Sequence, residues 1–304
     1  WSVNTLVASP LAKGLFHRAI GESGGTFGPG TYLKEDREGR PSAEKIGAAF
    51  AKAAGADSIK ALRALPVEKI IEVFNNDPEG KKFRTQPNVD GWALPDEIRN
   101  IFAQGKQNDV PVIVGSNANE MTTLTAPAMV PKTMEDYRKR VESQYGAMIK
   151  EFDAAYPVKS EADIAAAYLG SLRDVTFTLP MRTWARQTST GRSKAWLYFF
   201  SHVPPNPNSK NLGAYHASEI VYVFNNLKRE NSLLQEADYK LAEMMSDYWI
   251  NFATTGAPNG KGLPKWTPYT REDEAYLDFC DTPQSRNHLL KDQLDFIEQF
   301  QKRR

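Results

Sequence analysis

The chain has 304 residues, 41% of them hydrophobic, which is enough to bury a sizeable core in one large domain or two small ones. Its 38 Lys and Arg balance 37 Asp and Glu, and a net charge of +1 argues against a nucleic-acid or membrane-surface partner, because such partners usually require a basic surface. The single cysteine excludes a disulfide within the chain and a cysteine-rich zinc site, and no apolar run approaches the ~20 residues of a membrane-spanning helix.

The first forty residues predict a short helix, a strand and a loop. The helix begins near Trp1 and ends before Pro10, because the residue before a proline disfavours helical geometry. Residues 14–20 predict a strand, and residues 26–41, rich in Gly, Pro and charge, predict a surface loop. The start does not resemble a signal peptide. Since a domain rarely begins within an element, we expect further residues upstream of Trp1.

Four helices are predicted between residues 42 and 104. Ser42 is a typical N-cap for a helix that reaches Gly55, a usual residue just past a helix C-terminus. Asp57 is predicted to cap a second, short helix. Two more helices are predicted over 67–74 and 96–104.

The rest of the chain alternates buried strands with long helical stretches. Residues 110–115 form an uninterrupted apolar run of mainly β-branched residues, typical of a strand buried on both faces of a parallel sheet, and residues 194–201 predict a second such strand. The other predicted elements are two or three helices over 134–190, an amphipathic helix over 239–253 that stops at Gly256, a last strand over 276–279 and a terminal helix over 289–301. Strands separated by long helical stretches indicate an α/β fold.

The segment from Gly21 to Gly25, Gly-Glu-Ser-Gly-Gly, matches the GxSxG pattern of a nucleophile elbow, in which a serine lies on a strained turn between a strand and a helix. Two features argue against that role for Ser23. The residues that follow, Thr-Phe-Gly-Pro-Gly, cannot begin a helix at once. Only 22 residues precede Ser23, too few for the strands that such a fold needs before its nucleophile. The alternative is that the glycines serve a tight turn at the strand end.

Two further residues are candidates for an acid–base pair. Glu120 follows the strand over 110–115, and active groups of open α/β sheets lie at the carboxyl ends of strands. His216 lies in a loop after the next strand, where it can serve as a general base. Alone, each residue is better explained as a solvated loop carboxylate or a structural histidine. Together they follow the order of acid before histidine after successive strands, which is the chain order of α/β hydrolases.

The remaining histidines and the cysteine are interpreted as structural. His17 lies in a predicted strand, His202 precedes two prolines, and His288 is near the C-terminus without an acidic pattern. The histidines lack HExxH spacing, which argues against a histidine-based metal centre. Cys280 is interpreted as a small core residue, with a reactive thiol as the alternative.

Five segments, taken together and in order, resemble the type-B carboxylesterase family, which includes cholinesterases and bacterial nitrobenzyl esterases. The similarity runs through nearly the whole chain. The segments are SPLAKGLFHRAI (9–20) with Ser23 and Gly24, PNVDG (87–91), VPVIVG (110–115) with Asn117 and Glu120, His216 with Glu219, Ile220, Val223 and Phe224, and YWINFA (248–253) with Gly256, Pro258, Asn259, Gly260 and Trp266.

This resemblance implies an α/β-hydrolase fold, with a mostly parallel sheet flanked by helices. Residues 1–304 are then the C-terminal part of a single carboxylesterase domain whose N-terminal strands are missing from the chain. Residues 125–190 are expected to form a helical subregion over the active site. Together with the loop over 26–41, these helices are expected to shape the acyl and alcohol pockets.

The resemblance also implies catalytic residues. In the family, the acid of the triad lies in a G-x-N-x-[DN]-E-G loop; Glu120 occupies its glutamate, and Met121 replaces its last glycine. The family's histidine begins an H-G-x-E-[IL] segment. His216 and Glu219 match its histidine and glutamate, and Ala217 replaces its glycine.

A second serine of the family, in a Q-S-G segment, matches Ser23, with Glu22 in place of the glutamine. By this resemblance, Ser23 is a hydrogen-bonding partner behind the histidine loop, near Glu219, and not the nucleophile. The family's nucleophile lies in a G-E-S-A-G elbow, expected just before Trp1, and its oxyanion segment lies further upstream. Glu120 and His216 are thus the implied catalytic residues, and Ser23 and Glu219 the supporting ones.

The implied function is hydrolysis of a small carboxylic ester through an acyl-enzyme, with no metal or organic cofactor. The chain alone is expected to be inactive, because its partner, the missing N-terminal half, supplies the serine and the oxyanion hole. A catalytically inactive binding or adhesion module is one alternative, and a small complete hydrolase that uses Ser23 is another. The family's secreted members favour a secreted or periplasmic location over a cytoplasmic one, whereas the lack of disulfide pairs argues the other way.

Overall fold

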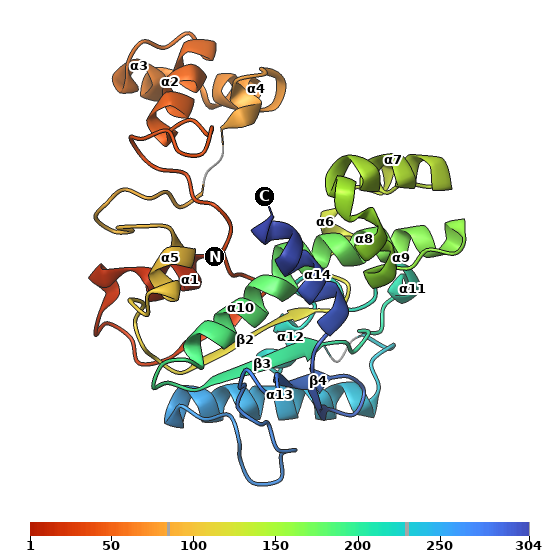
Figure 1. Ribbon diagram of the computed structural model, residues 1–304. Coiled ribbons are helices and arrows are strands. Elements are labelled where there is room, and N and C mark those ends of the chain that lie inside the picture. The colour runs from red at the N-terminus through yellow and green to blue at the C-terminus, as the bar shows by residue number, and fades with distance from the viewer. Residues whose placement is uncertain (84–85, 229–230, 304) are drawn as a thin grey trace.

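The computed structural model describes residues 1–83, 86–228 and 231–303, and a five-stranded sheet with strand order β1-β2-β3-β4-β5 lies at the centre of this described part (Figure 1). Neighbouring strands from β1 to β4 run parallel, and β5 is antiparallel to β4. The strands are β1 (Ala19–Glu22), β2 (Val112–Asn117), β3 (Ala195–Phe200), β4 (Ala275–Phe279) and β5 (Gln284–Asn287). The predicted α/β class with a mostly parallel sheet is confirmed.

Every residue of β2, β3 and β4 is buried. The apolar runs over 110–115 and 194–201 predict this burial for β2 and β3, and the last strand predicted over 276–279 is present as β4. Two differences concern the edges of the sheet. The strand predicted over 14–20 begins only at Ala19, because the chain turns at Gly14, with φ +79°, and residues 15–18 are irregular. The sequence gives no signal for β5, because all four of its residues are polar and exposed.

The two faces of the sheet are covered by different helices (Figure 1). Helix α13 (Glu236–Thr255) packs on one face, where it meets Ile113 of β2 and Trp196 of β3. Helix α10 (Leu179–Thr188) packs on the other face against the alternate side chains of the same strands, Val114 and Leu197. Three further helices lie on the α10 side: α1 (Ser2–Ala8), α5 (Ile98–Ala103) and α14 (Lys291–Lys302).

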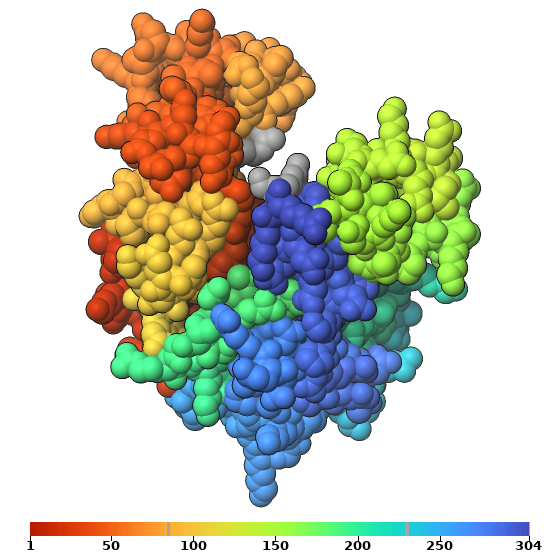
Figure 2. Space-filling view, viewed as in Figure 1, coloured from red at the N-terminus to blue at the C-terminus, as the bar shows by residue number. Residues whose placement is uncertain are grey.

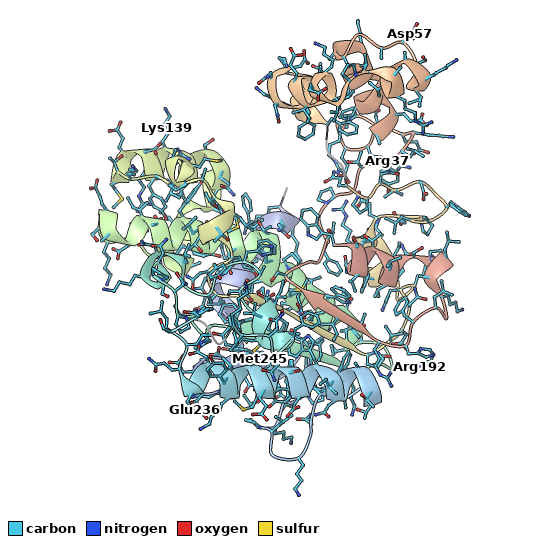
Figure 3. The ribbon with its side chains drawn as sticks, turned by 180° about the vertical axis from the view of Figure 1, so that it is seen from behind. Arg37, Asp57, Lys139, Arg192, Glu236 and Met245 are labelled. Carbon is cyan, nitrogen blue, oxygen red and sulfur yellow. The ribbon has the colours of Figure 1, made fainter. Side chains whose placement is uncertain are left out.

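Two helical lobes extend from this body, and the molecule is hollowed between them (Figure 2). Seen from behind, Asp57 lies at the tip of the first lobe and Lys139 on the outer helix of the second (Figure 3). The first lobe holds α2 (Ala43–Ala53), α3 (Ile59–Ala64) and α4 (Val67–Asn76), and the second holds α7 (Met134–Tyr145), α8 (Ile149–Ala155) and α9 (Glu161–Arg173). The remaining α-helices are the short α6 (Met121–Leu124), α11 (Ser209–Leu212) and α12 (Ile220–Val223).

Several helix boundaries follow the predictions. The Ser42 hydroxyl accepts a hydrogen bond from Lys45 N and caps α2, and α13 ends at Gly256. The predicted cap at Asp57 is wrong, because the neighbouring Ser58 hydroxyl accepts the bond from Ala61 N that caps α3. The prediction of two or three helices over 134–190 is also wrong.

Within residues 134–190, all of which the structure describes, there are four α-helices, and a π-helical turn over Asp174–Thr178 joins α9 to α10. This turn continues α9 into α10 without a loop, so the sequence offers no break between them. No helix in the described ranges is long and apolar enough to cross a bilayer.

We expect Gly115→Ala to lower the free energy of unfolding by about 1–3 kcal/mol, because overpacked cores are destabilised to this extent. Gly115 lies opposite Tyr198 of β3, and a Cβ on Gly115 would lie 2.3 Å from Cδ1 of that ring. Urea unfolding measures the change. Gly47→Ala in α2 is the control, since no atom lies within 4 Å of the added carbon. Equal unfolding free energies for Gly115→Ala and the wild type would contradict the prediction.

Candidate active site

The carboxylate of Glu120 lies at the centre of the candidate site. Glu120 lies three residues past the end of β2 and is 0% exposed. Its Oε2 lies 2.5 Å from Nδ1 of His216. Its Oε1 accepts hydrogen bonds from the Ser23 hydroxyl at 2.5 Å and from Asn117 N at 2.8 Å. The residues that the sequence predicts as acid and base therefore lie in direct contact, at the carboxyl ends of neighbouring strands.

Two asparagines join the loop of the acid to the loop of the histidine. Asn117 Nδ2 donates to Tyr215 O at 2.8 Å. Asn119 N donates to Ala214 O at 2.9 Å, and Asn119 Oδ1 accepts from Ala214 N at 3.0 Å. Gly213, with φ +60°, lies so close to this amide that a Cβ would stand 2.2 Å from Asn119 Oδ1. These bonds on either side of Tyr215 fix the chain immediately before His216.

The backbone next to the contact is strained at two residues that are not glycine. Ser23 has φ +51° and Ala217 has φ +69°. A left-handed conformation is unfavourable for residues with a Cβ, and such strain collects at functional sites. The left-handed turn after His216 explains why a glycine suits the position that Ala217 occupies.

The Nε2 edge of the His216 ring is partly exposed to solvent. Its side chain is 34% exposed, and no residue within the described ranges hydrogen-bonds Nε2. Phe177 stacks on the face of the ring, with centroids 5.3 Å apart. An imidazole that is bonded to a carboxylate through Nδ1 can accept a proton through Nε2.

Ser23 lies at the end of β1 and serves the acid in this geometry. Its N–H donates to Gly115 O at 2.8 Å, and its hydroxyl donates to Glu120 rather than to His216. Residues 24–42, all described, contain no helix, so the strand–turn–helix of a nucleophile elbow does not form around Ser23. The sequence predicts Ser23 near Glu219; the hydrogen-bond partner in the structure is Glu120.

Two further carboxylates lie behind the contact, with Glu219 buried and Glu22 half-buried. Glu219 accepts a hydrogen bond from Asn117 Nδ2, and burial raises the Glu219 pKa to about 7. Glu22 accepts from Trp249 Nε1 at 2.7 Å, and burial also raises its pKa. The Tyr198 hydroxyl is buried without a hydrogen-bond partner among the described residues, and burial raises its pKa well above the ordinary value, with smaller contributions from the negative charges of all three glutamates.

The sequence predictions did not include the parts played by Phe177, Trp249 and Tyr198. Trp249 falls on the apolar stripe of an amphipathic helix and Tyr198 within a buried strand, so their patterns indicate packing alone. Phe177 lies inside a long helical stretch with no motif around it. Asn117 carries a signal, because it belongs to the acid-loop motif.

The other histidines and the cysteine make no hydrogen bond to Glu120 or His216. His202 is buried, and its ring nitrogens bond to Asp281 and, on the other edge, to Tyr222 and Asp238. The remaining side chains lie elsewhere: His288 near Glu274, Cys280 bonded to Thr282 O, and His17 in the turn before β1. Within the described ranges, no group of three or more His, Cys, Asp or Glu side chains is arranged to hold a metal ion.

Comparisons with known proteins agree on one family. Residues 1–297 match the sequence profile of the carboxylesterase family. The chain is 30% identical to carboxylesterase 1F of Mus musculus, covering 97% of this chain and 57% of that protein, and 30% identical to liver carboxylesterase 1F of Rattus norvegicus, covering 99% and 58%. Among solved structures, a PNB esterase matches with a TM-score of 0.75 at 23% identity, over 97% of this chain and 61% of that one. The chain thus spans little more than half the length of these relatives.

We expect Ala217→Gly to raise the free energy of unfolding by about 0.5–1 kcal/mol, because glycine removes the strain at φ +69° and offsets part of the gain by its freedom in the unfolded chain. Urea unfolding measures the change. Ala48→Gly in α2 is the control and should lower stability by about 0.5–1 kcal/mol, as glycine does within helices. A loss of stability in Ala217→Gly would contradict the interpretation.

We expect Glu219→Gln to remove a pH-dependent loss of stability. The folded chain holds the Glu219 proton up to about pH 7, whereas an unfolded glutamate releases it near its ordinary pKa of 4.5. Since the folded state then binds more protons, the Glu219 contribution to the free energy of unfolding falls as pH rises from about 4.5 to 7, by up to about 1.4 kcal/mol per unit.

Urea unfolding of Glu219→Gln and the wild type at pH 5, 6, 7 and 8 measures this term as the difference between them. That difference should grow up to about pH 7 in favour of the variant and then level off. The exposed Glu151→Gln is the control and should run parallel to the wild type. Parallel curves for Glu219→Gln would show that its carboxyl titrates normally.

Proposed function

The chain belongs to the carboxylesterase family, and from this premise we propose that the protein that contains it hydrolyses carboxylic esters. The observation that carries the proposal is the 2.5 Å contact between Glu120 Oε2 and His216 Nδ1. A carboxylate in this position keeps the proton on Nδ1 and leaves Nε2 to accept another. Such a pair is the acid–base half of a serine-hydrolase triad.

In the proposed reaction, His216 Nε2 takes the proton of an attacking serine hydroxyl as the serine oxygen bonds to the ester carbonyl carbon. The same proton passes to the leaving alcohol as its bond to that carbon breaks. Glu120 stabilises the imidazolium in between. In the second half, water attacks the acyl carbon and His216 accepts the water proton. The proton passes to the serine oxygen as its bond to that carbon breaks, and the carboxylic acid product leaves. The chemistry requires no metal or organic cofactor.

We propose that the nucleophile and the oxyanion hole belong to a segment that precedes Trp1 in the whole protein. The Ser23 hydroxyl is engaged by the acid, which supports a different serine. The start of α1 lies against the end of β1: the Trp1 nitrogen is 2.8 Å from where a Cβ on Gly24 would be, and Asn4 Oδ1 accepts from Thr26 N at 3.0 Å. A residue before Trp1 would enter next to the segment that carries Ser23.

Ser23 and Glu219 then have supporting roles. Ser23 orients the carboxylate of Glu120, and Glu219 acts through Asn117, which holds the loop before His216. We further propose that the helical subregion over 125–190 covers the site. Phe177 of this subregion supports that, because it contacts His216. The substrate is a small carboxylic ester, and the family resemblance favours a secreted or periplasmic protein.

We expect Glu120→Gln to lower kcat by about 10³–10⁴ in the protein completed by its upstream segment. Ser23 and Asn117 both donate to the Oε1 side, so the amide oxygen takes that place and the NH₂ group faces His216 Nδ1. The imidazole must then carry its proton on Nε2, where it cannot act as base. Initial rates with p-nitrophenyl acetate measure the effect, and His216→Ala should abolish turnover.

The exposed Glu151→Gln is the control and should keep the wild-type kcat. A near-normal kcat in Glu120→Gln would mean that another residue is the acid. A completed wild-type protein with no turnover on a panel of esters would favour a binding module instead.

We expect the 304-residue chain by itself to hydrolyse p-nitrophenyl acetate no faster than buffer, because the proposed nucleophile and oxyanion hole lie upstream of Trp1 and no hydroxyl of the described residues is bonded to the His216 ring. The measurement compares the chain with its Ser23→Ala variant, which removes the hydroxyl bonded to Glu120. Turnover that is present in the chain and lost in Ser23→Ala would overturn this part of the proposal.

A further inference from the structure

The ring of Phe177 lies flat against the ring of His216. Their centroids are 5.3 Å apart and their planes differ by 29°, and Phe177 is 5% exposed. The hydrogen bond to Glu120 holds only the Nδ1 edge of the imidazole. It leaves the ring free to rock about that bond, which would swing Nε2 out of line. A second ring packed on the face blocks this motion.

Phe177 reaches this place because the helix is wider at this point. It lies in the π-helical turn Asp174–Thr178, and such turns are frequent at functional sites. The physical cause is Pro180, the second residue of α10. A proline has no N–H for the carbonyl four residues earlier and clashes with it, so the backbone opens next to Thr176.

The π-helical turn is anchored to the loop that carries the acid. Arg173 donates through Nε to Asp174 Oδ1 at 2.8 Å and through NH1 to Ala118 O at 2.9 Å, two residues before Glu120. Tyr156 donates to Asp174 Oδ2 at 2.8 Å. A second set of bonds ties the end of the turn to β2, where the Ser116 hydroxyl donates to Thr178 Oγ1 at 3.3 Å. The acid and the stacked ring are therefore positioned from the same strand end.

We propose that Phe177 is a positioning residue for His216, whose ring holds the imidazole plane so that Nε2 keeps one direction while Nδ1 stays bonded to Glu120. Phe177 acts through His216 and not on the reacting atoms. The expected effect on kcat rests on the proposed role of His216 as the base, whereas the expected effect on the mobility of the His216 ring does not. The test therefore measures the ring and the reaction separately.

The first measurement is the mobility of the His216 ring in the full 304-residue chain. The chain has only four histidines, so ¹³C-labelled histidine gives few signals, and His216→Gln assigns the relevant one. In the wild type we expect the Cε1–H order parameter to be that of a rigid group, about 0.85, and in Phe177→Leu below about 0.6. Phe177→Tyr keeps an aromatic face and should restore the rigid value.

Phe50→Leu is the matched control, because Phe50 is 6% exposed, close to the value for Phe177, but packs with Phe83 in the first lobe. It should lose similar stability in urea and leave the His216 signal unchanged. An unchanged His216 order parameter in Phe177→Leu would overturn the proposal. If Phe177→Leu does not fold, Phe177→Tyr provides the test. A His216 ring in that variant as mobile as the ring of a surface histidine would overturn the proposal.

The second measurement is steady-state kinetics of the completed protein. Because small misplacements of a catalytic group are costly, Phe177→Leu should lower kcat about 10- to 100-fold and leave KM within about twofold. A raised KM with unchanged kcat would assign the ring to substrate contact and overturn the positioning role. If the wild type hydrolyses no ester but the ring mobility changes as expected, the positioning stands and the proposed reaction fails.

Discussion

The structure of the site depends on satisfying one buried charge. A carboxylate taken out of water is costly unless hydrogen-bond donors or an opposite charge replace its hydration. Glu120 is fully buried and receives donors from three segments: Ser23 after β1, Asn117 at the end of β2, and His216 from the loop before α12. Each donor is far from the others in sequence. The need to meet this one carboxylate therefore brings three separate parts of the chain together and fixes where the imidazole lies.

The backbone is locally strained on both sides of the contact between Glu120 and His216. Ser23 and Ala217 adopt left-handed backbone conformations directly beside the acid and after the base. The cost is tolerated because neighbouring bonds hold these residues from several sides: Ser23 N–H to Gly115 O, and the loop before Ala217 through Asn117 and Asn119. The two asparagines, which lie in the motif around the acid, thus hold the backbone before His216 in place.

The sequence predicts most of the sheet and the acid–base contact, because these features have local sequence patterns. The features that it misses lack such patterns. Uninterrupted apolar runs predict β2 and β3, because strands buried on both faces carry no alternation. The exposed polar β5 lacks that pattern and is missed. Glu120 and His216 follow from strand order and motif. Phe177 does not, because its stacking depends on a π-helical turn set by Pro180 and by the long-range bonds of Arg173, and no local pattern contains them.

The three glutamates of the site differ in the hydrogen bonds that their carboxylates receive. Glu120 accepts three hydrogen bonds from other residues, whereas Glu219 accepts from the Asn117 side chain and from its own backbone N–H, and Glu22 accepts from Trp249. Burial without compensating donors favours the neutral form, and burial accordingly raises the pKa of Glu219 and of Glu22. The carboxylate that faces the imidazole is thus the one with the most side-chain and backbone donors from other residues. With Glu22 at the position where the family's segment has a glutamine, two carboxyls with pKa values raised by burial lie behind the histidine loop instead of one.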